Sequence, residues 1–156
     1  MKVIICESKK GSWFAPIYAL FMGGQTAYPH GMIWNNGKLY DSTFFRGRFG
    51  EVKSIKDNRT VIVFDVEGDC QEWINNNLGA KYDWLGVILW TLGIHAEQHF
   101  YCYEIIQRSL LSIGVDLDIK YRINGSKIID ALLNIGYDAE VMQGKQFNEK
   151  FLNVST

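Results

Sequence analysis

Cys102 stands where the sequence predicts the first turn of a long amphipathic helix, and it is the first candidate for chemistry in this chain. The apolar residues after it recur with the three-and-four spacing of a helix that has one buried face: Ile105, Ile106, Leu110 and Ile113. Gly114 then provides a C-terminal stop. The unpaired N–H groups and the dipole of a helix N-terminus favour a thiolate, so this position predicts a nucleophilic cysteine. The alternative is a small core residue that happens to begin a helix.

His30 is the second candidate, because no other side chain in its stretch of the chain titrates near neutrality. Residues 11–37 contain no Asp, Glu, Lys or Arg. The same region predicts a β-hairpin with strands Tyr28–Trp34 and Lys38–Thr43 around the turn signal Asn35-Asn36-Gly37. Asp41 lies on the second of these strands. Whether its carboxylate meets the imidazole depends on the turn.

Three turns are open for this hairpin, two of two residues and one of three. A two-residue loop at Asn36-Gly37 pairs Trp34 with Leu39 and places His30 diagonally across from Asp41, with roughly 7–8 Å between their backbones. A loop at Asn35-Asn36 pairs His30 with Asp41 directly. Both registers put the imidazole and the carboxylate on one face, within reach of a hydrogen bond, whereas a three-residue loop separates them. A partly buried histidine with an unrelated surface aspartate is the alternative.

Composition favours a single globular domain and argues against nucleic-acid binding and against a disulfide-rich or cysteine-zinc protein. The chain has 156 residues, of which 47% are hydrophobic, which suits one domain with its own core. Sixteen basic residues against seventeen acidic ones leave a net charge of -1, so nucleic acid is not an expected partner. The three cysteines, Cys6, Cys70 and Cys102, are widely spaced and contain no CxxC pair. This argues against a disulfide framework and a cysteine zinc site, and favours a reducing compartment.

The remaining periodicity predicts short strands alternating with helices. The expected strands are Val3–Cys6, Gly50–Ile55 and Thr60–Val66, and the expected helices cover residues 12–21, 69–78, 84–92 and 126–135. The longest apolar runs span 13–23 and 84–94, short of the ~20 residues that cross a bilayer, so no transmembrane segment is expected. No basic-then-apolar signal segment opens the chain, so a cytoplasmic location is expected.

Four segments, in this order, resemble the circularly permuted NlpC-type branch of the papain-like cysteine hydrolases. They are Pro29-His30-Gly31-Met32-Ile33, Leu39-Tyr40-Asp41-Ser42, Gly79-Ala80-Lys81-Tyr82-Asp83-Trp84-Leu85-Gly86 and Phe100-Tyr101-Cys102-Tyr103-Glu104. That branch is related to the lecithin retinol acyltransferases. The similarity covers about residues 1–135. The chain departs from the family at Tyr103, where a serine is usual, at Lys81, where proline is usual, and in an insert over residues 90–98.

The resemblance implies an α+β, permuted papain-like fold, in which a small antiparallel sheet packs against the helix that carries the cysteine. We expect one domain over residues 1–142, followed by a tail over 143–156 that is polar in sequence and therefore frayed. By the same match His30 is the base, Asp41 the residue that orients it, and Cys102 the nucleophile. Tyr82 corresponds to a tyrosine that helps build the substrate side of the site. No cofactor and no metal are implied.

The expected reaction is acyl transfer, most often hydrolysis of an amide through an acyl-thioester. The substrates that the family admits are peptides, cell-wall peptides and acyl lipids, so an amidase or peptidase and a lipid acyl hydrolase or acyltransferase are both open. The oligomeric state is open as well.

Two other classes compete with an active enzyme. His95, His99 and Cys102 have the spacing of a zinc site on one helical face. The segment from His95 to His99 superficially resembles the zinc-protease motif, but Ala96 stands where that motif needs Glu. A papain-like fold that binds without catalysis is the other possibility.

Overall fold

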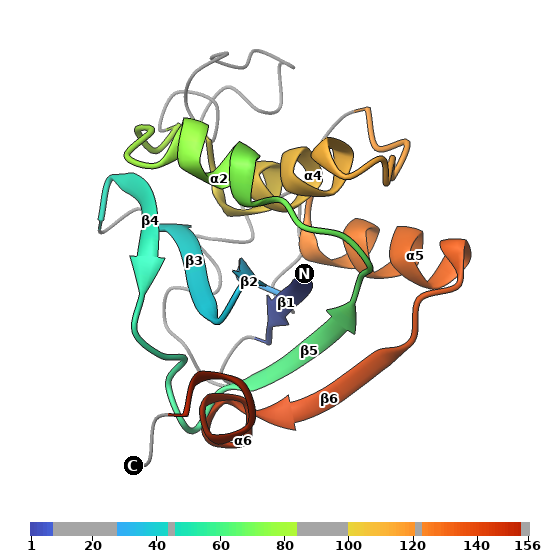
Figure 1. The fold of residues 1–156 in the computed structure, drawn as a ribbon. Helices are drawn as coiled ribbons and strands as arrows, with labels where there is room; N and C mark the ends of the chain where they lie inside the picture. The colour runs from blue at the N-terminus through green and yellow to red at the C-terminus, as the bar shows by residue number, and fades with distance from the viewer. Residues whose placement is uncertain (8–27, 44–45, 84–99, 121–122, 154–156) are drawn as a thin grey trace.

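The strands of this α+β protein form a single antiparallel sheet in the part of the chain that the computed structural model describes, which is residues 1–7, 28–43, 46–83, 100–120 and 123–153. The sheet has six strands in the order β4-β3-β2-β1-β5-β6 (Figure 1). Their bounds are Lys2–Cys6 (β1), His30–Asn35 (β2), Lys38–Thr43 (β3), Arg48–Val52 (β4), Thr60–Asp65 (β5) and Ala139–Gln143 (β6). The helices expected over 12–21 and 84–92 lie outside the described residues, as do His95 and His99.

The central strands are buried on both faces, which explains their runs of β-branched residues. In β1, Val3 and Ile5 belong to one hydrophobic core, while Ile4 and Cys6 belong to a second core on the other face. The neighbouring strand β5 carries the run Val61-Ile62-Val63-Phe64, which divides between the same two cores. Continuous apolar strands of this kind are typical of a sheet covered on both sides.

Three helices cover one face of the sheet: α2 (Gln71–Asn77), α4 (Cys102–Ser112) and α5 (Gly125–Ile135), which lie along one side of the strands in Figure 1. Their buried side chains, such as Ile74, Ile106 and Leu132, form the larger core together with the sheet. Asn124 caps α5 by accepting a hydrogen bond from the Lys127 N–H, so this helix begins at Gly125, one residue earlier than the expected start at 126.

The other face is covered by the end of the chain. Helix α6 (Gly144–Phe147) continues into a π-helix, η2 (Asn148–Leu152), and Phe147 is fully buried against strand residues such as Ile4 and Val63. This differs from the expected polar tail over 143–156, because β6 crosses the expected boundary and residues 144–152 are helical. The sequence signal was weak, since only two aromatics, Phe147 and Phe151, alternate with polar residues there.

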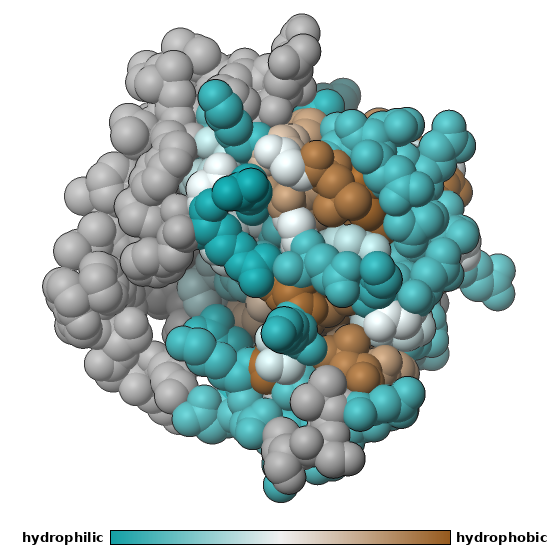
Figure 2. All heavy atoms as spheres, turned by 60° about the vertical axis from the view of Figure 1, so that its left-hand side comes forward, coloured by the Kyte–Doolittle hydropathy of each residue, from teal (hydrophilic) through white to brown (hydrophobic). Residues whose placement is uncertain are grey.

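The described surface has scattered apolar groups. The largest exposed hydrophobic side chains are Leu78, Leu111, Leu133, Ile135 and Val141. Figure 2 shows that, on the side it presents, hydrophobic groups are separated by hydrophilic ones. None of the helices in the described segments combines the length and the apolar character needed to cross a membrane.

Candidate active site

The β2–β3 hairpin closes through a two-residue loop, and this sets the register that places His30 and Asp41. Trp34 pairs with Leu39 and Asn35 with Lys38, which leaves Asn36 and Gly37 as the loop. Both loop residues have positive φ, 48° and 79°, the backbone that this tight hairpin turn requires. Of the registers open from the sequence, the structure has the one in which His30 lies diagonally across from Asp41.

His30 and Asp41 form a hydrogen-bonded pair at the end of the hairpin away from the turn. The imidazole Nε2 lies 3.3 Å from Asp41 Oδ2, and the two side chains are only 15% and 6% exposed. The other carboxylate oxygen, Oδ1, accepts a hydrogen bond of 3.4 Å from Arg46 Nη1, which also donates to the Glu51 carbonyl. Arg46 therefore helps to fix the carboxylate that orients the imidazole.

Cys102 is the first residue of α4, as the sequence predicts. Tyr101 is the N-cap in an extended conformation, and its N–H donates to the Glu104 carboxylate. The residue before the cap, Phe100, is held by the sheet, because its carbonyl accepts a hydrogen bond of 3.0 Å from the Ser42 hydroxyl. The cysteine is 4% exposed and lines the same pocket as His30 and Asp41. The start of α4 thus lies at the same pocket as the residues of β2 and β3 that carry the imidazole and the carboxylate.

The protonation of His30 follows from its neighbours. Burial of the imidazole lowers its pKa, but hydrogen bonds to Asp41 and Cys102, with further electrostatic contributions from Cys102 and Cys6, raise it to about 10. Since the ring nitrogen Nε2 is hydrogen-bonded to Asp41, Nδ1 is the ring nitrogen available for the hydrogen bond to the Cys102 sulfur. The imidazole therefore carries a proton across the neutral range, and a thiolate beside it has a positive partner.

Tyr82 reaches the pocket because its segment pairs with the edge of the sheet. The Tyr82 N–H donates to the Gly47 carbonyl, and the Phe49 N–H donates to the Ala80 carbonyl, at 2.9 and 2.8 Å. Burial raises the pKa of the Tyr82 hydroxyl, and the charge of Cys102 raises it further. The phenol therefore stays protonated and is a hydrogen-bond donor in the pocket that Cys102 lines. The four residues that the sequence and the resemblance single out therefore line one pocket.

This pocket has a volume of about 430 Å³, within the range of sites for small ligands. The remaining lining residues are Pro29, Met32, Ser42, Thr43, Arg46, Val52, Ser54, Ile55, Lys56 and Arg59. Sequence reasoning missed the three basic ones, Arg46, Lys56 and Arg59. They lie in loops between strands, where a basic residue usually faces solvent, so nothing local distinguishes them from other surface cations.

The other cysteines have different surroundings. Burial raises the pKa of Cys6, which lies in the central strand β1, and raises that of Cys70 to about 11. Neither is at the first position of a helix, since Cys70 precedes α2 and Cys6 ends β1. No cluster of His, Cys, Asp and Glu in the described segments is suited to a metal ion, and the zinc hypothesis rests on His95 and His99, outside those segments.

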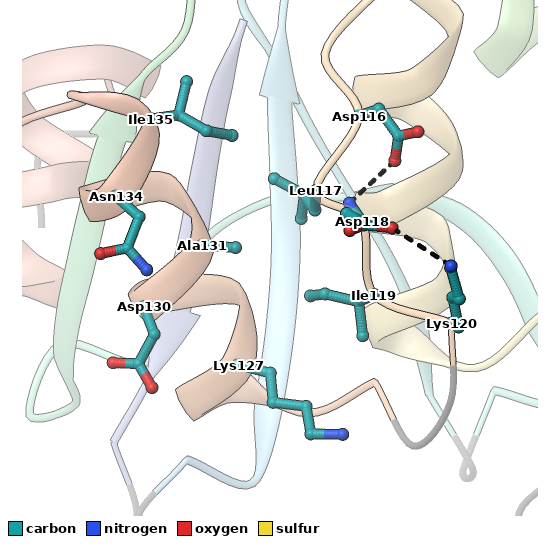
Figure 3. A pocket seen from close by; sticks show the side chains of 10 residues that line it. All are labelled: Asp116, Leu117, Asp118, Ile119, Lys120, Lys127, Asp130, Ala131, Asn134 and Ile135. Carbon is teal, nitrogen blue, oxygen red and sulfur yellow. Dashed lines mark hydrogen bonds and ion pairs between the residues drawn. The ribbon is translucent and has the colours of Figure 1, made fainter.

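A second hollow, of about 720 Å³, lies between α5 and the chain that follows α4 (Figure 3). Lys127, Asp130 and Asn134 line it from α5, and the opposite wall carries Asp118, which pairs with Lys120. It is open to solvent, and its lining contains no cysteine and no histidine. The smaller pocket is therefore the one with groups for covalent chemistry.

In comparisons with known proteins, no family model, no curated protein and no solved structure matches the chain.

Proposed function

We propose that this chain is a cysteine amidase or peptidase with a permuted papain-like fold, in which Cys102 is the nucleophile, His30 the acid–base group and Asp41 the orienting residue. The observation that carries the proposal is the meeting of these three side chains, from a helix start and two strands, in one pocket. A protonated imidazole between a carboxylate and a cysteine at a helix N-terminus is what a thiolate–imidazolium pair requires.

The reaction proceeds in two stages. The Cys102 thiolate adds to the carbonyl carbon of the amide, and the oxyanion is stabilised by backbone N–H groups at the start of α4. His30 gives its proton to the departing amine, leaving an acyl-thioester. The neutral imidazole then takes a proton from water, which attacks the thioester and releases the acid. Asp41 keeps the ring in the tautomer and orientation that both transfers need.

Selective alkylation tests the nucleophile. With iodoacetamide near pH 7, Cys102 is expected to react much faster than Cys6 or Cys70, because only Cys102 combines a helix start with a neighbouring imidazolium. Peptide mapping of the alkylated protein gives the three rates. Equal labelling of the three thiols, or preferential labelling of Cys70, contradicts the proposal.

Turnover on a panel of cell-wall peptides, other peptides and acyl lipids tests the reaction. The Cys102→Ala and His30→Ala proteins are expected to be inactive on whichever substrate the wild type cleaves. The His95→Ala and His99→Ala proteins are the controls and are expected to keep most activity. Loss of activity in these two, with zinc bound to the purified protein, favours the metal site instead. Cleavage of lipids alone assigns a lipid acyl hydrolase or acyltransferase, and a reactive thiol without turnover on any substrate assigns a binding module.

A further inference from the structure

Positive charge is concentrated around the nucleophile's pocket. Its described lining contains three basic side chains, Arg46, Lys56 and Arg59, whereas its only acidic side chain is Asp41. Arg46 and His30 both contact that carboxylate. Lys56 and Arg59 form no ion pair with any carboxylate among the residues that the structure describes. Two positive charges in the pocket are thus left for a ligand.

Arg59 lies close to the reacting groups. Its guanidinium interacts with the thiol of Cys6, and Cys6 pairs directly with His30 in the β1–β2 ladder. The Arg59 Nε is buried and finds no hydrogen-bond acceptor in the described part of the chain. A buried N–H donor without an acceptor is costly, and an anionic ligand would remove that cost.

The loop that carries both cations is held in place from two sides. The Arg59 N–H donates to the Lys56 carbonyl, and the Arg59 carbonyl accepts a hydrogen bond from the Gly144 N–H at the start of α6. Beside them, the buried Asn148 side chain bonds both the N–H and the carbonyl of Ile55. The backbone that carries the two cations is therefore fixed before a ligand arrives, which lowers the entropic cost of binding.

We infer that the substrate of this site is a peptide whose carboxylate is held by Lys56 and Arg59 while its scissile carbonyl lies at Cys102. The inference rests on the proposed function and adds the substrate class to it. A guanidinium offers two parallel N–H donors to a carboxylate, and Lys56 adds a point charge at the exposed rim. The apolar side chains of Met32, Val52 and Ile55 also line the pocket and suit the stem of an acidic side chain or of a C-terminal residue.

Two alkylating reagents that differ only in charge test this without knowledge of the natural substrate. Iodoacetate and iodoacetamide both transfer a two-carbon group to the thiolate and release iodide, but only iodoacetate carries a carboxylate. The iodoacetate-to-iodoacetamide rate ratio at Cys102 is expected to exceed the ratio for glutathione in the same buffer. Arg59→Gln and Lys56→Gln should each lower it roughly three- to ten-fold, and added salt should lower it as well.

Two matched variants separate charge from structural damage. Lys53→Gln removes an exposed lysine that does not line the pocket, and it should leave the ratio unchanged. Arg59→Lys keeps the charge and should keep most of the preference. If the iodoacetate-to-iodoacetamide rate ratio is unchanged in Arg59→Gln and Lys56→Gln while iodoacetamide stays selective for Cys102, the carboxylate site is overturned. The assignment of Cys102 as the nucleophile is then unaffected. Failure of both reagents to select Cys102 overturns the proposed function itself.

Protection against iodoacetamide then distinguishes the source of the anion. N-acetylglycine, a minimal peptide carboxylate, is expected to slow alkylation of Cys102 in the wild type but not in Arg59→Gln. Protection by inorganic phosphate at a lower concentration than N-acetylglycine would contradict the peptide assignment and point to a phosphate-bearing substrate.

Discussion

At the scale of the residue, the proposed chemistry depends on the protonation of His30, which is set by a competition between burial of its imidazole and two partners. Burial favours the neutral ring, whereas Asp41 and Cys102 favour the charged ring, and the result is a pKa of about 10. In the unfolded chain a histidine has a pKa near 6.5. The proton on folded His30 therefore adds stability that is complete below pH ~6.5 and is lost as the pH rises through ~10.

Replacement of Asp41 by Asn should lower the pKa of His30, because it removes a hydrogen-bonded negative charge and keeps the shape of the side chain. The loss of stability with rising pH should then occur at lower pH, and turnover should fall strongly. NMR titration of the His30 ring gives the pKa directly, and thermal melting gives the stability. Asp65→Asn, at an exposed position on β5, is the control and should leave the His30 titration unchanged. An unaltered titration in Asp41→Asn would mean that another group orients the ring.

At the scale of the elements, close approach of β2 to α4 brings the imidazole to the helix start. Gly31, next to His30, faces α4, where a Cβ atom would lie 2.5 Å from Ile106 Cδ1 and 3.0 Å from the Tyr103 ring. Tyr103 also donates its hydroxyl proton to the Tyr28 carbonyl, two residues before His30. Tyr103 therefore ties the helix to the segment that leads into β2, the strand that carries the histidine.

Gly31→Ala should push β2 away from α4 and destabilise the protein by roughly 1–3 kcal/mol, the usual cost of overpacking a core. Alkylation of Cys102 should slow as well, since the imidazole moves with the strand. Gly50→Ala, on β4, is the matched control because a Cβ there meets nothing within 4 Å. Urea unfolding and iodoacetamide kinetics on the two variants provide the comparison. Equal effects of the two substitutions would argue against a close approach at Gly31.

The first turn of α4 contains a second titrating group. Burial raises the pKa of the Glu104 carboxyl to about 7, above the value of 4.5 for an unhindered glutamate. The folded protein thus holds this proton more tightly than the unfolded chain does. Its stability should fall as the pH rises from ~4.5 to ~7, with the full penalty above pH 7.

Glu104→Gln should therefore be more stable than the wild type at pH 8, by about 1–3 kcal/mol, and nearly equal to it at pH 4.5. The amide oxygen can still accept the hydrogen bond from the Tyr101 N–H. Glu72→Gln changes an exposed first-turn glutamate of α2 and should give no such gain. Unfolding curves across this pH range decide the matter, and a Glu104→Gln protein that is less stable at pH 8 would contradict the argument.

At the scale of the whole molecule, the end of the chain supports the pocket from the face of the sheet opposite α4. Asn148 is 1% exposed and makes three hydrogen bonds with its side chain. Its Oδ1 accepts from the Ile55 N–H, and its Nδ2 donates to the Ile55 carbonyl and to Asp57. These bonds join segments more than ninety residues apart and hold the loop that presents Lys56 and Arg59.

Asn148→Ala should cost about 2–4 kcal/mol, because it leaves both backbone groups of Ile55 buried without partners. It should also reduce the preference of Cys102 for iodoacetate, since the cationic loop is no longer fixed. Glu149→Ala, at the exposed neighbouring position, should stay within about 0.5 kcal/mol of the wild type. Chemical denaturation and the two reagents supply both measurements. A stable Asn148→Ala protein with an unchanged reagent preference would mean that the loop needs no such support.

Local signals in the sequence determined helix α4, with Cys102 at its start, and the β2–β3 hairpin, which carries His30 and Asp41. Apolar spacing and Gly114 predict α4, and its start at Cys102 follows from that pattern alone. The alternation around Asn35-Asn36-Gly37 predicts the hairpin, and in two of the three turns that the sequence leaves open Asp41 lies within reach of His30. Such predictions succeed because a turn, a cap and a hydrophobic period are properties of a few neighbouring residues.

Only the tertiary structure decided what meets at the pocket. The choice among hairpin registers depended on the backbone conformation of Asn36 and Gly37, which form the loop with positive φ. The sequence Asn35-Asn36-Gly37 is compatible with more than one turn. The approach of Arg59 to Cys6 follows from the pairing of β1 with β5, and the support of Ile55 by Asn148 joins residues ninety-three positions apart. Periodicity carries no information about such partners, because it records which side of an element is buried and not which distant side chain covers it.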